Sequence, residues 1–273
     1  MILPILDQLL IALPLALGAY LTLSLLKLPD FSIESAYLFG AVMAYLAQDL
    51  PLPWVLLSAG FGGAFVGIIV TSLNQYLKLP FLLAAIITNG VFHGLTQYLL
   101  GTSLQSFHPL LGISEPIFLS IVSVGLIAIV AILLFSQLGY SLAIYGHNPH
   151  FFQHHPVSGR YVLFSGVLLG HACAGIAGFL FSLSNGFVDL TMNYGIILLS
   201  LSALILGKSF IRTNKPNLLI PLVGLFAYFC IQQILLHVGL NLKYFNSFQA
   251  LCILGALGLF QWKKKISIDH LGV

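Results

Sequence analysis

The polar side chains that could do chemistry are few, and they lie within or beside long apolar segments. Asn89 and His93 are four positions apart, which places them one turn apart on the same face of a helix. Polar groups inside a membrane are costly to bury and usually face a cavity or the interior of a helix bundle. The pair therefore predicts the lining of a polar pathway, with a hydrogen bond between helices as the structural alternative.

A second group of polar residues lies in the segment 184–195, SNGFVDLTMNYG. This segment joins a flexible Asn-Gly pair to an aromatic ring, an acid and a second amide. If it dips into the membrane, Phe187 could stack on a ligand while Asp189 and Asn193 offer charge and hydrogen bonds. An ordinary outer loop is the alternative.

Two patterns resemble catalytic or metal-binding signatures without meeting their requirements. The tripeptide GKS at 207–209 matches the end of a phosphate-binding loop, but Ser202 stands where an earlier glycine is required. One loop carries four histidines, His147, His150, His154 and His155. Their spacing could hold a metal, yet the helical zinc signature is absent and no cysteine lies nearby. We therefore expect no metal site and no ATP bound by this route.

The composition identifies the environment in which these residues work. The chain has 273 residues, of which 59% are hydrophobic and 6% charged, with a mean hydropathy of +1.04. Soluble domains carry about 25% charged residues, so this chain cannot solvate an ordinary protein surface. A net charge of +3 from ten Lys and Arg is too small for a nucleic-acid-binding patch. The composition predicts a polytopic membrane protein.

Nine stretches are long and apolar enough to be membrane-spanning helices, which need about 20 residues each. They are 8–26, 33–49, 52–73, 80–101, 115–137, 160–183, 194–212, 218–240 and 244–261. The second is short, with Glu34 and Ser35 at its start, which favours a broken or half-length helix as much as a regular one. We predict an all-α transmembrane bundle that forms a single domain over 1–273.

The basic residues predict the orientation, because cytoplasmic loops carry an excess of Lys and Arg. With the N-terminus outside and the C-terminus inside, only Lys243 of the basic residues lies outside. The cytoplasmic loops then hold Lys27, Lys78, Arg160, Lys208, Arg212, Lys215, Lys263, Lys264 and Lys265. We therefore expect a multi-pass protein of the cytoplasmic (inner) membrane, in contact with lipid.

The segment 160–183 carries small residues at every fourth position, which places them on one face of a helix. They are Gly166, Gly170, Ala174 and Gly178. Small side chains let another helix backbone approach closely. The pattern predicts tight packing within the subunit.

The longest cytoplasmic segment, 138–160, is too polar to span a membrane and too apolar for a slack linker. It contains the turn YGHNP at 145–149 and suits a small surface helix that a partner could grip. A Gly/Ala-rich helix and the turn GFVDLTMNYG at 186–195 follow it. In this order, the motifs of 139–208 resemble permease subunits of ABC importers of the branched-chain amino acid and ribose type, especially the tryptophan or amino-acid branch. The stretch FSIESAYLFGAVMAYLA near the N-terminus is similar to the broken second helix of that family.

The resemblance implies a dimer of this permease or of two paralogues around a central pathway, two cytoplasmic ATPase subunits and an external solute-binding protein. The coupling residues that it implies are Gly146, His147, Asn148, Pro149, His150, Phe151, Phe152, His154 and His155. The expected pathway residues are Glu34, Asn89, His93, Phe187, Asp189 and Asn193. The chain itself is expected to catalyse no reaction and to hold no cofactor, because ATP and magnesium would bind to the partner subunits. An amino acid or similar small solute is the expected cargo.

Two other functional classes stay open. An ion-coupled secondary transporter would work alone, with Glu34 as its coupling carboxylate. An intramembrane enzyme would use His93 or His171 with Asp189, although no nucleophile motif accompanies them. The sequence leaves open the solute, the direction of transport and the choice between homodimer and heterodimer.

Overall fold

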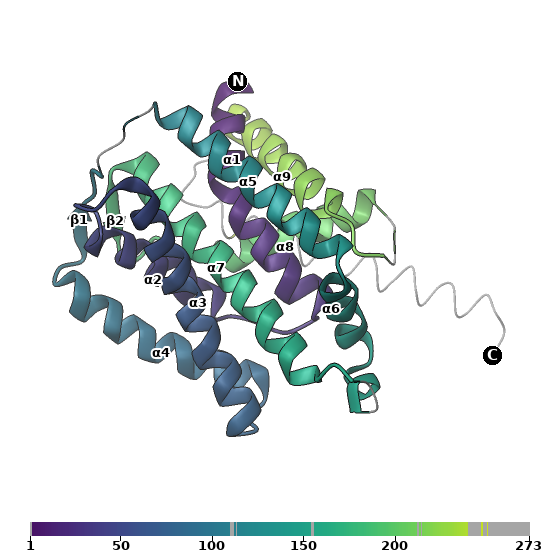
Figure 1. Ribbon diagram of the computed structural model, residues 1–273. Helices are drawn as coiled ribbons and strands as arrows, with labels where there is room; N and C mark the ends of the chain where they lie inside the picture. The colour runs from purple at the N-terminus through teal and green to yellow at the C-terminus, as the bar shows by residue number, and fades with distance from the viewer. Residues whose placement is uncertain are drawn as a thin grey trace.

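The computed structural model describes residues 2–109, 112, 114–153, 156–211, 213, 215–239, 247 and 250. Helices dominate these ranges (Figure 1). The helices are α1 (Ile2–Ala19), the π-helical η1 (Tyr20–Leu25), α2 (Ile33–Leu46), α3 (Leu52–Tyr76), α4 (Phe81–Leu100), α5 (Glu115–Phe135), α6 (Gln137–His147), the 3-10 helix η2 (Pro149–Gln153), α7 (Gly159–Asn185), α8 (Ile196–Phe210) and α9 (Leu219–His237).

Local sequence explains where several helices begin and end. Pro51 and Pro80 directly precede α3 and α4, where their fixed backbone and missing N–H do not interrupt a helical hydrogen bond. Gly101 and Gly186 end α4 and α7 in the left-handed conformation, with φ of 72° and 75°. Glycine adopts this conformation without steric cost and commonly closes a helix.

Helix α7 runs through the middle of the bundle and packs against α1, α2 and α3 (Figure 1). Its small residues face the neighbouring backbones. A side chain at Gly178 would meet the carbonyl of Tyr37, and one at Gly170 would meet Thr22. The close packing expected from the small-residue pattern is therefore confirmed.

Five helical segments in the described ranges are long and apolar enough to cross a membrane. They are Ile5–Leu25, Leu52–Tyr76, Glu115–Phe135, Gly159–Asn185 and Leu219–His237. Two shorter apolar helices are Ile33–Leu46 and Ile196–Phe210. The helical membrane architecture agrees with the sequence, whereas the number of spans and the orientation stay predictions. The expected ninth span, 244–261, falls almost entirely outside the described residues.

The second expected span is a half-length helix. Helix α2 has 14 residues, which corresponds to about 21 Å. A non-helical crossing at 26–32 separates it from η1. The break places Asp30 and Ser32 in the middle of the protein, where both are fully buried.

A small two-stranded sheet accompanies the predicted helices. Strands β1 (Leu104–Ser106) and β2 (Phe187–Asp189) pair antiparallel, with Leu104 opposite Asp189 and Ser106 opposite Phe187. Three-residue strands are too short to show a recognisable alternation, which is why the sequence pattern did not predict them. The sheet joins the segment after α4 to the segment after α7.

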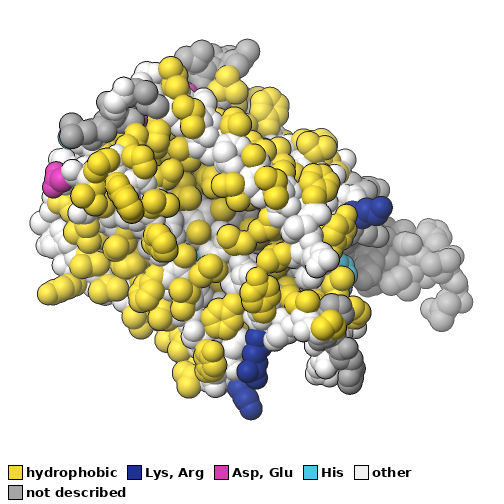
Figure 2. All heavy atoms as spheres, in the orientation of Figure 1, with side chains coloured by type: hydrophobic (Ala, Val, Ile, Leu, Met, Phe, Trp, Pro, Cys, Tyr) yellow, Lys and Arg dark blue, Asp and Glu magenta, His cyan; other side chains and the backbone are white. Residues whose placement is uncertain are grey.

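The surface is that of a lipid-facing protein. Figure 2 shows hydrophobic side chains across the visible face, with Lys and Arg at its lower and right margins. Large apolar side chains such as Phe61, Ile132 and Phe135 are 72%, 72% and 82% exposed. An apolar surface of this extent is typical of a protein embedded in a membrane.

Candidate functional site

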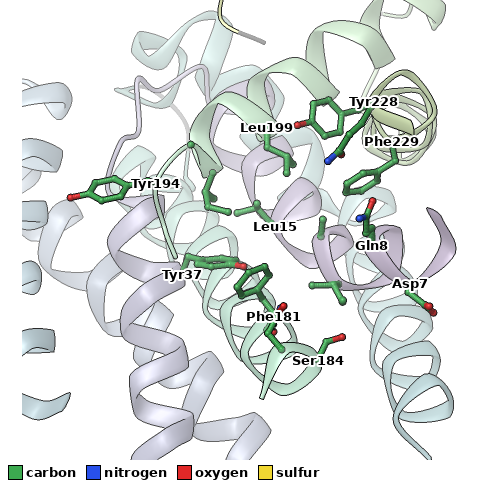
Figure 3. A pocket seen from close by; sticks show the side chains of 16 residues that line it. Asp7, Gln8, Leu15, Tyr37, Phe181, Ser184, Tyr194, Leu199, Tyr228 and Phe229 are labelled. Carbon is green, nitrogen blue, oxygen red and sulfur yellow. The ribbon is translucent and has the colours of Figure 1, made fainter. Parts of the chain in front are cut away.

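A cavity of about 490 Å³ lies among α1, α2, α7, α8 and α9 (Figure 3). We call it the aromatic cavity, because its walls include the rings of Tyr37, Phe181, Tyr194, Tyr228 and Phe229. Its polar lining residues are Asp7, Gln8, Ser184, Asn185 and Gln232. The lining thus combines apolar rings with a few hydrogen-bonding groups, which is typical of small-molecule sites.

Two polar atoms of this lining are buried without a hydrogen-bond partner in the described part of the chain. They are the amide oxygens Oε1 of Gln8 and Gln232. Figure 3 shows Gln8 beside Phe229 at one side of the cavity. A buried acceptor without a donor is costly, so both oxygens can gain from a ligand N–H or O–H group. Neither glutamine was among the expected pathway residues, because sequence alone does not show which polar groups share a cavity.

None of the six expected pathway residues lines the aromatic cavity, although two lie close to its lining in the sequence. Glu34 is one helical turn before Tyr37 on α2, and its carboxylate lies near the backbone N–H of Ile197. Asn193 directly precedes Tyr194. Glu34 therefore lies where the start of α2 comes close to the start of α8.

The two expected residues of α4 have different surroundings. The Asn89 amide oxygen accepts from the Ser35 hydroxyl at 2.6 Å, and its nitrogen donates to the Phe31 carbonyl at 3.0 Å. These bonds fasten α4 to the start of α2. His93 is exposed on α4, a helix that packs mainly against α2 and α3. Asn89 thus forms the expected hydrogen bond between segments, whereas the exposed His93 takes no part in it.

The segment 184–195 forms the β2 strand followed by a turn. Phe187 and Asp189 are half-buried, whereas Val188 between them is fully buried. The Asp189 carboxylate oxygen Oδ1 accepts from the backbone N–H of Thr191 at 2.8 Å. The carboxylate therefore stabilises the turn that leads to Tyr194 in the cavity wall.

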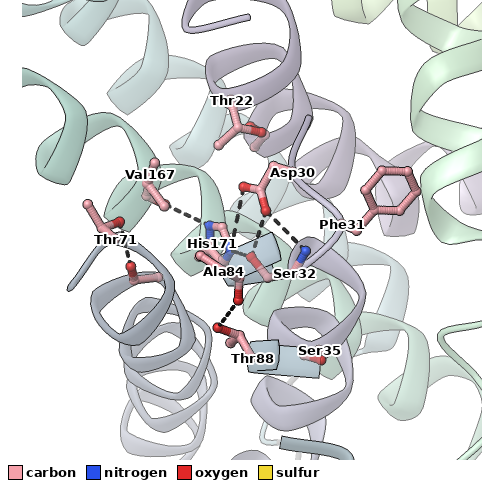
Figure 4. A network of polar contacts seen from close by, with 12 residues as sticks. Thr22, Asp30, Phe31, Ser32, Ser35, Thr71, Ala84, Thr88, Val167 and His171 are labelled. Atoms are coloured by element: carbon pink, nitrogen blue, oxygen red, sulfur yellow. Dashed lines mark hydrogen bonds and ion pairs between the residues drawn. The ribbon is translucent and has the colours of Figure 1, made fainter. Parts of the chain in front are cut away.

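A second polar site is a buried network that links the break before α2 to the middle of α7 (Figure 4). The Ser32 hydroxyl lies 2.6 Å from Asp30 Oδ1 and 2.9 Å from His171 Nε2. The Ser32 backbone N–H donates to the same carboxylate oxygen at 3.0 Å. Asp30 was not among the expected site residues, because an acid beside a proline between two spans resembles an ordinary loop residue.

Hydrogen bonds connect the buried polar side chains of this network. His171 Nδ1 must donate to the Val167 carbonyl, 2.9 Å away, because a carbonyl only accepts. The Ser32 hydroxyl donates to Asp30 Oδ1, and its oxygen faces His171 Nε2. This pairing lowers the cost of burying the three polar side chains.

The contacts of His171 and Asp189 differ from those that an intramembrane enzyme would need. His171 contacts Asp30, Ser32 and Val167, whereas the Asp189 carboxylate bonds to Thr191. The Ser32 hydroxyl lies between the acid and the histidine, and Ser32 is fully buried. The expected pairing of His171 with Asp189 is not formed in the structure.

The expected coupling segment forms two short helices, α6 and η2. At Gly146, a side chain would collide with the Leu25 carbonyl, so α6 lies directly against η1. Phe152 is buried, with its ring 5.9 Å from Tyr145 and 5.4 Å from Phe151 between centroids. Asn148, which ends α6, and the neighbouring residues His147, Pro149 and His150 are exposed. His154 and His155 lie outside the described residues.

Comparisons with known proteins give one family match and two relatives. The family described as the permease component of the branched-chain amino acid transport system matches residues 1–257. An uncharacterized protein of Rickettsia prowazekii is 28% identical over 251 residues, which are 86% of this chain and 89% of that protein. A tyrosine transport system permease protein of Clostridioides difficile is 27% identical over 236 residues, which are 83% of this chain and 80% of that protein. No solved structure is significantly similar to the chain.

Proposed function

The chain belongs to the family of branched-chain amino acid transport permeases, and from this premise we propose that it carries an amino-acid-like solute across the cytoplasmic membrane. Family membership confirms the resemblance that the sequence indicated and makes the chain a transport subunit. In the proposal, partner ATPases drive alternation between outward-open and inward-open states. ATP and magnesium belong to those partners.

The observation that carries the proposed solute class is the lining of the aromatic cavity. Aromatic walls favour an apolar or ring-bearing side chain, and they attract an ammonium group placed over a ring face. The unpaired oxygens of Gln8 and Gln232 supply acceptors for an ammonium group. An amino acid offers both features in one molecule.

The position of the aromatic cavity suits the acceptance of solute at one side of the membrane. Gln8 and Leu25 lie near opposite ends of the continuous helical segment 2–25, and Leu25 contacts α6. The cavity therefore lies at the end of the bundle away from α6. With the N-terminus outside, this end would face an external solute-binding protein.

The expected pathway residues extend the proposal to a second permease subunit. His93 is exposed on α4, which lies at the edge of the bundle in Figure 1. A pathway that includes His93 needs a second wall, which a second copy or a paralogue would supply. Glu34, Asn89, Phe187, Asp189 and Asn193 stay in the proposed pathway as groups close to α2 and the β2 turn.

Purification of the tagged chain from its native membrane, followed by mass spectrometry of co-purifying proteins, tests the proposed assembly. We expect a stoichiometric ATPase subunit, with or without a solute-binding protein. Recovery of the chain alone, under conditions that preserve a known ABC complex, would contradict the proposal. It would favour the self-contained secondary transporter, with Glu34 as its coupling site.

Solute-stimulated ATPase activity of the purified complex, measured across a panel of amino acids, tests the solute class. A Phe181→Ala variant should weaken the stimulation by aromatic or large apolar amino acids, because it removes one wall of the cavity. Phe135→Ala is the matched control, since Phe135 is 82% exposed on the lipid-facing surface. Equal loss in both variants, or stimulation by no amino acid, would contradict the proposed solute class.

A further inference from the structure

A second cavity, of about 260 Å³, lies at the α6 end of the bundle, among η1, α6, α8 and the residues that lead into α9. We call it the basic cavity. Four of its lining residues carry or can carry positive charge: Lys27, His147, Lys208 and Lys215. They come from four separate parts of the chain, which the fold brings to one place.

The positive charge of the basic cavity has no partner in the described part of the chain. The chain contains seven Asp and Glu residues, and none of the six that the structure describes lines this cavity. Lys27 and Lys208 both line this one cavity, so their positive charges share it. Like charges held near one another favour the binding of an anion between them.

The backbone holds these basic residues in defined positions. Lys27 has a φ of +54°, a conformation that is uncommon for residues other than glycine. On either side of it, the Leu26 and Leu28 N–H groups donate to carbonyls of η1. The break between η1 and α2 therefore fixes the backbone position of Lys27 at this cavity.

Hydrogen bonds also hold the other walls of the basic cavity in place. The Asn217 backbone N–H donates to the Tyr20 hydroxyl at 2.8 Å, which ties the segment containing Lys215 to η1. His147 Nδ1 donates to the Ala143 carbonyl at 2.9 Å, at the last residue of α6. This bond keeps the His147 ring at the wall of the cavity.

We propose that the basic cavity binds a phosphate-bearing anion, either the headgroup of an anionic phospholipid or a soluble phosphate. Basic pockets between membrane helices on the cytoplasmic side are suited to anionic headgroups. Apolar neighbours of the lysines, Leu25 and Ile220, match the acyl and glycerol parts of a lipid. The site is separate from the aromatic cavity, and its occupancy does not depend on which solute is carried.

An anion in this cavity would touch the coupling segment and the bundle at once. His147 belongs to α6, whereas Lys27 lies just after η1 and Lys208 belongs to α8. The anion would therefore hold α6 against the bundle at the place where Gly146 already contacts Leu25. Anionic lipid would in this way strengthen the connection between partner ATPases and the membrane helices.

The test uses the full-length chain, with the subunits that co-purify, in nanodiscs of phosphatidylcholine with or without phosphatidylglycerol. After transfer to mild detergent, mass spectrometry measures the phosphatidylglycerol retained per chain. A double variant, Lys27→Asn with Lys208→Gln, should reduce this retention by about tenfold or more. Asparagine at position 27 removes the charge and tolerates the positive φ.

The chain offers a matched control in Lys78, which has the same φ of +54° and does not line the basic cavity. Lys78→Asn should retain the lipid as the unmodified chain does. If the double variant does not fold, lipid retention is measured in the single variant Lys208→Gln, which changes an exposed position near the end of α8.

A parallel arm measures thermal stabilisation by inorganic phosphate and distinguishes the two sources of the anion. Lipid retention that depends on Lys27 and Lys208 supports a phospholipid headgroup. Stabilisation by inorganic phosphate with the same dependence, without lipid retention, supports a soluble phosphate. Binding of neither anion, or an equal loss in the Lys78→Asn control, would overturn the proposal.

Discussion

The Nε2 atom of His171 lies 3.6 Å from the Oδ2 atom of Asp30, and both side chains are fully buried. The pair joins two segments that are far apart in the sequence, the break before α2 and the middle of the central helix α7. Together with Ser32 it fixes the point at which the chain leaves η1 and begins a half-length helix. The network is therefore a structural element of the broken helix.

The first prediction concerns the stability that this pair supplies. Asp30→Ala should lower the free energy of unfolding by about 3–5 kcal/mol, because it removes one partner of a buried pair and leaves the Ser32 hydroxyl and backbone N–H without their acceptor. Asp30→Asn keeps an acceptor oxygen and should cost less. Unfolding of the purified protein in detergent measures both. Asp49→Ala changes an exposed acid outside this network and is the control; a comparable loss of stability there would contradict the assignment.

The second prediction concerns the packing of α7 on α3. A side chain at Gly175 would collide with the Ala59 carbonyl and with the backbone of Gly63. Gly175→Ala should therefore destabilise the protein by about 1–3 kcal/mol or more, since the backbones must separate. Gly125→Ala on α5 is the matched control, because a methyl group added there would meet nothing within 4 Å in the described part of the chain. Equal unfolding midpoints for the two variants would contradict this prediction, because they would show that α3 and α7 can separate without a cost in free energy.

The third prediction concerns communication with the ATPases. Gly146→Ala would push α6 away from the Leu25 carbonyl, while Gly146→Trp or deletion of 147–155 would disrupt the segment entirely. We expect Gly146→Ala to weaken solute-stimulated ATPase activity several-fold, by about 0.5–2 kcal/mol of coupling. We expect Gly146→Trp and the deletion to abolish ATP-driven transport, with membrane insertion intact in all three variants.

Gly94→Ala on α4 is the control for the coupling experiment, because a methyl group there meets nothing within 4 Å among the described residues. Normal ATPase coupling in the deletion variant would rule out a docking role for this segment.

The fourth prediction separates stability from solute binding in the aromatic cavity. Gln232→Leu removes a buried acceptor that has no partner among the described residues and should raise the free energy of unfolding by about 1 kcal/mol. The same change should lower uptake of an amino-acid-like solute, since it removes a group available to the ligand. Gln233→Leu is the neighbouring control, because Gln233 does not line the cavity. Unchanged uptake in Gln232→Leu would remove that glutamine from the proposed site.

The fifth prediction concerns the charge at the β2 turn. Asp189→Ala should weaken solute handling, by loss of both its charge and its hydrogen bond from Thr191. Asp189→Asn retains an acceptor for the turn and removes only the charge. We expect reduced uptake in both variants; full activity of Asp189→Asn would show that the carboxylate serves the turn alone.

Composition and local spacing were enough to predict several properties of the chain. The scarcity of charge required a membrane environment, and apolar stretches of sufficient length required helices, because backbone groups in lipid must bond within their own segment. The four-residue spacing from Gly166 to Gly178 predicted the close packing of α7. The segment 138–160 was predicted to hold a short helix after a turn at 145–149; the structure has the 3-10 helix η2 there, whereas residues 145–147 end the helix α6 and form no turn.

Which polar residues contact one another could not be predicted without the arrangement of the helices in space. Ser32 and His171 are 139 positions apart, and their contact depends on how α7 is rotated against the start of α2. The same applies to Gln8 and Gln232, which share a cavity, and to Lys27 and Lys208, which share another. Helical periodicity assigns a residue to a face of its own helix. The rotation and depth of each helix against its neighbours follow from packing of the whole bundle, and these decide which faces form a site.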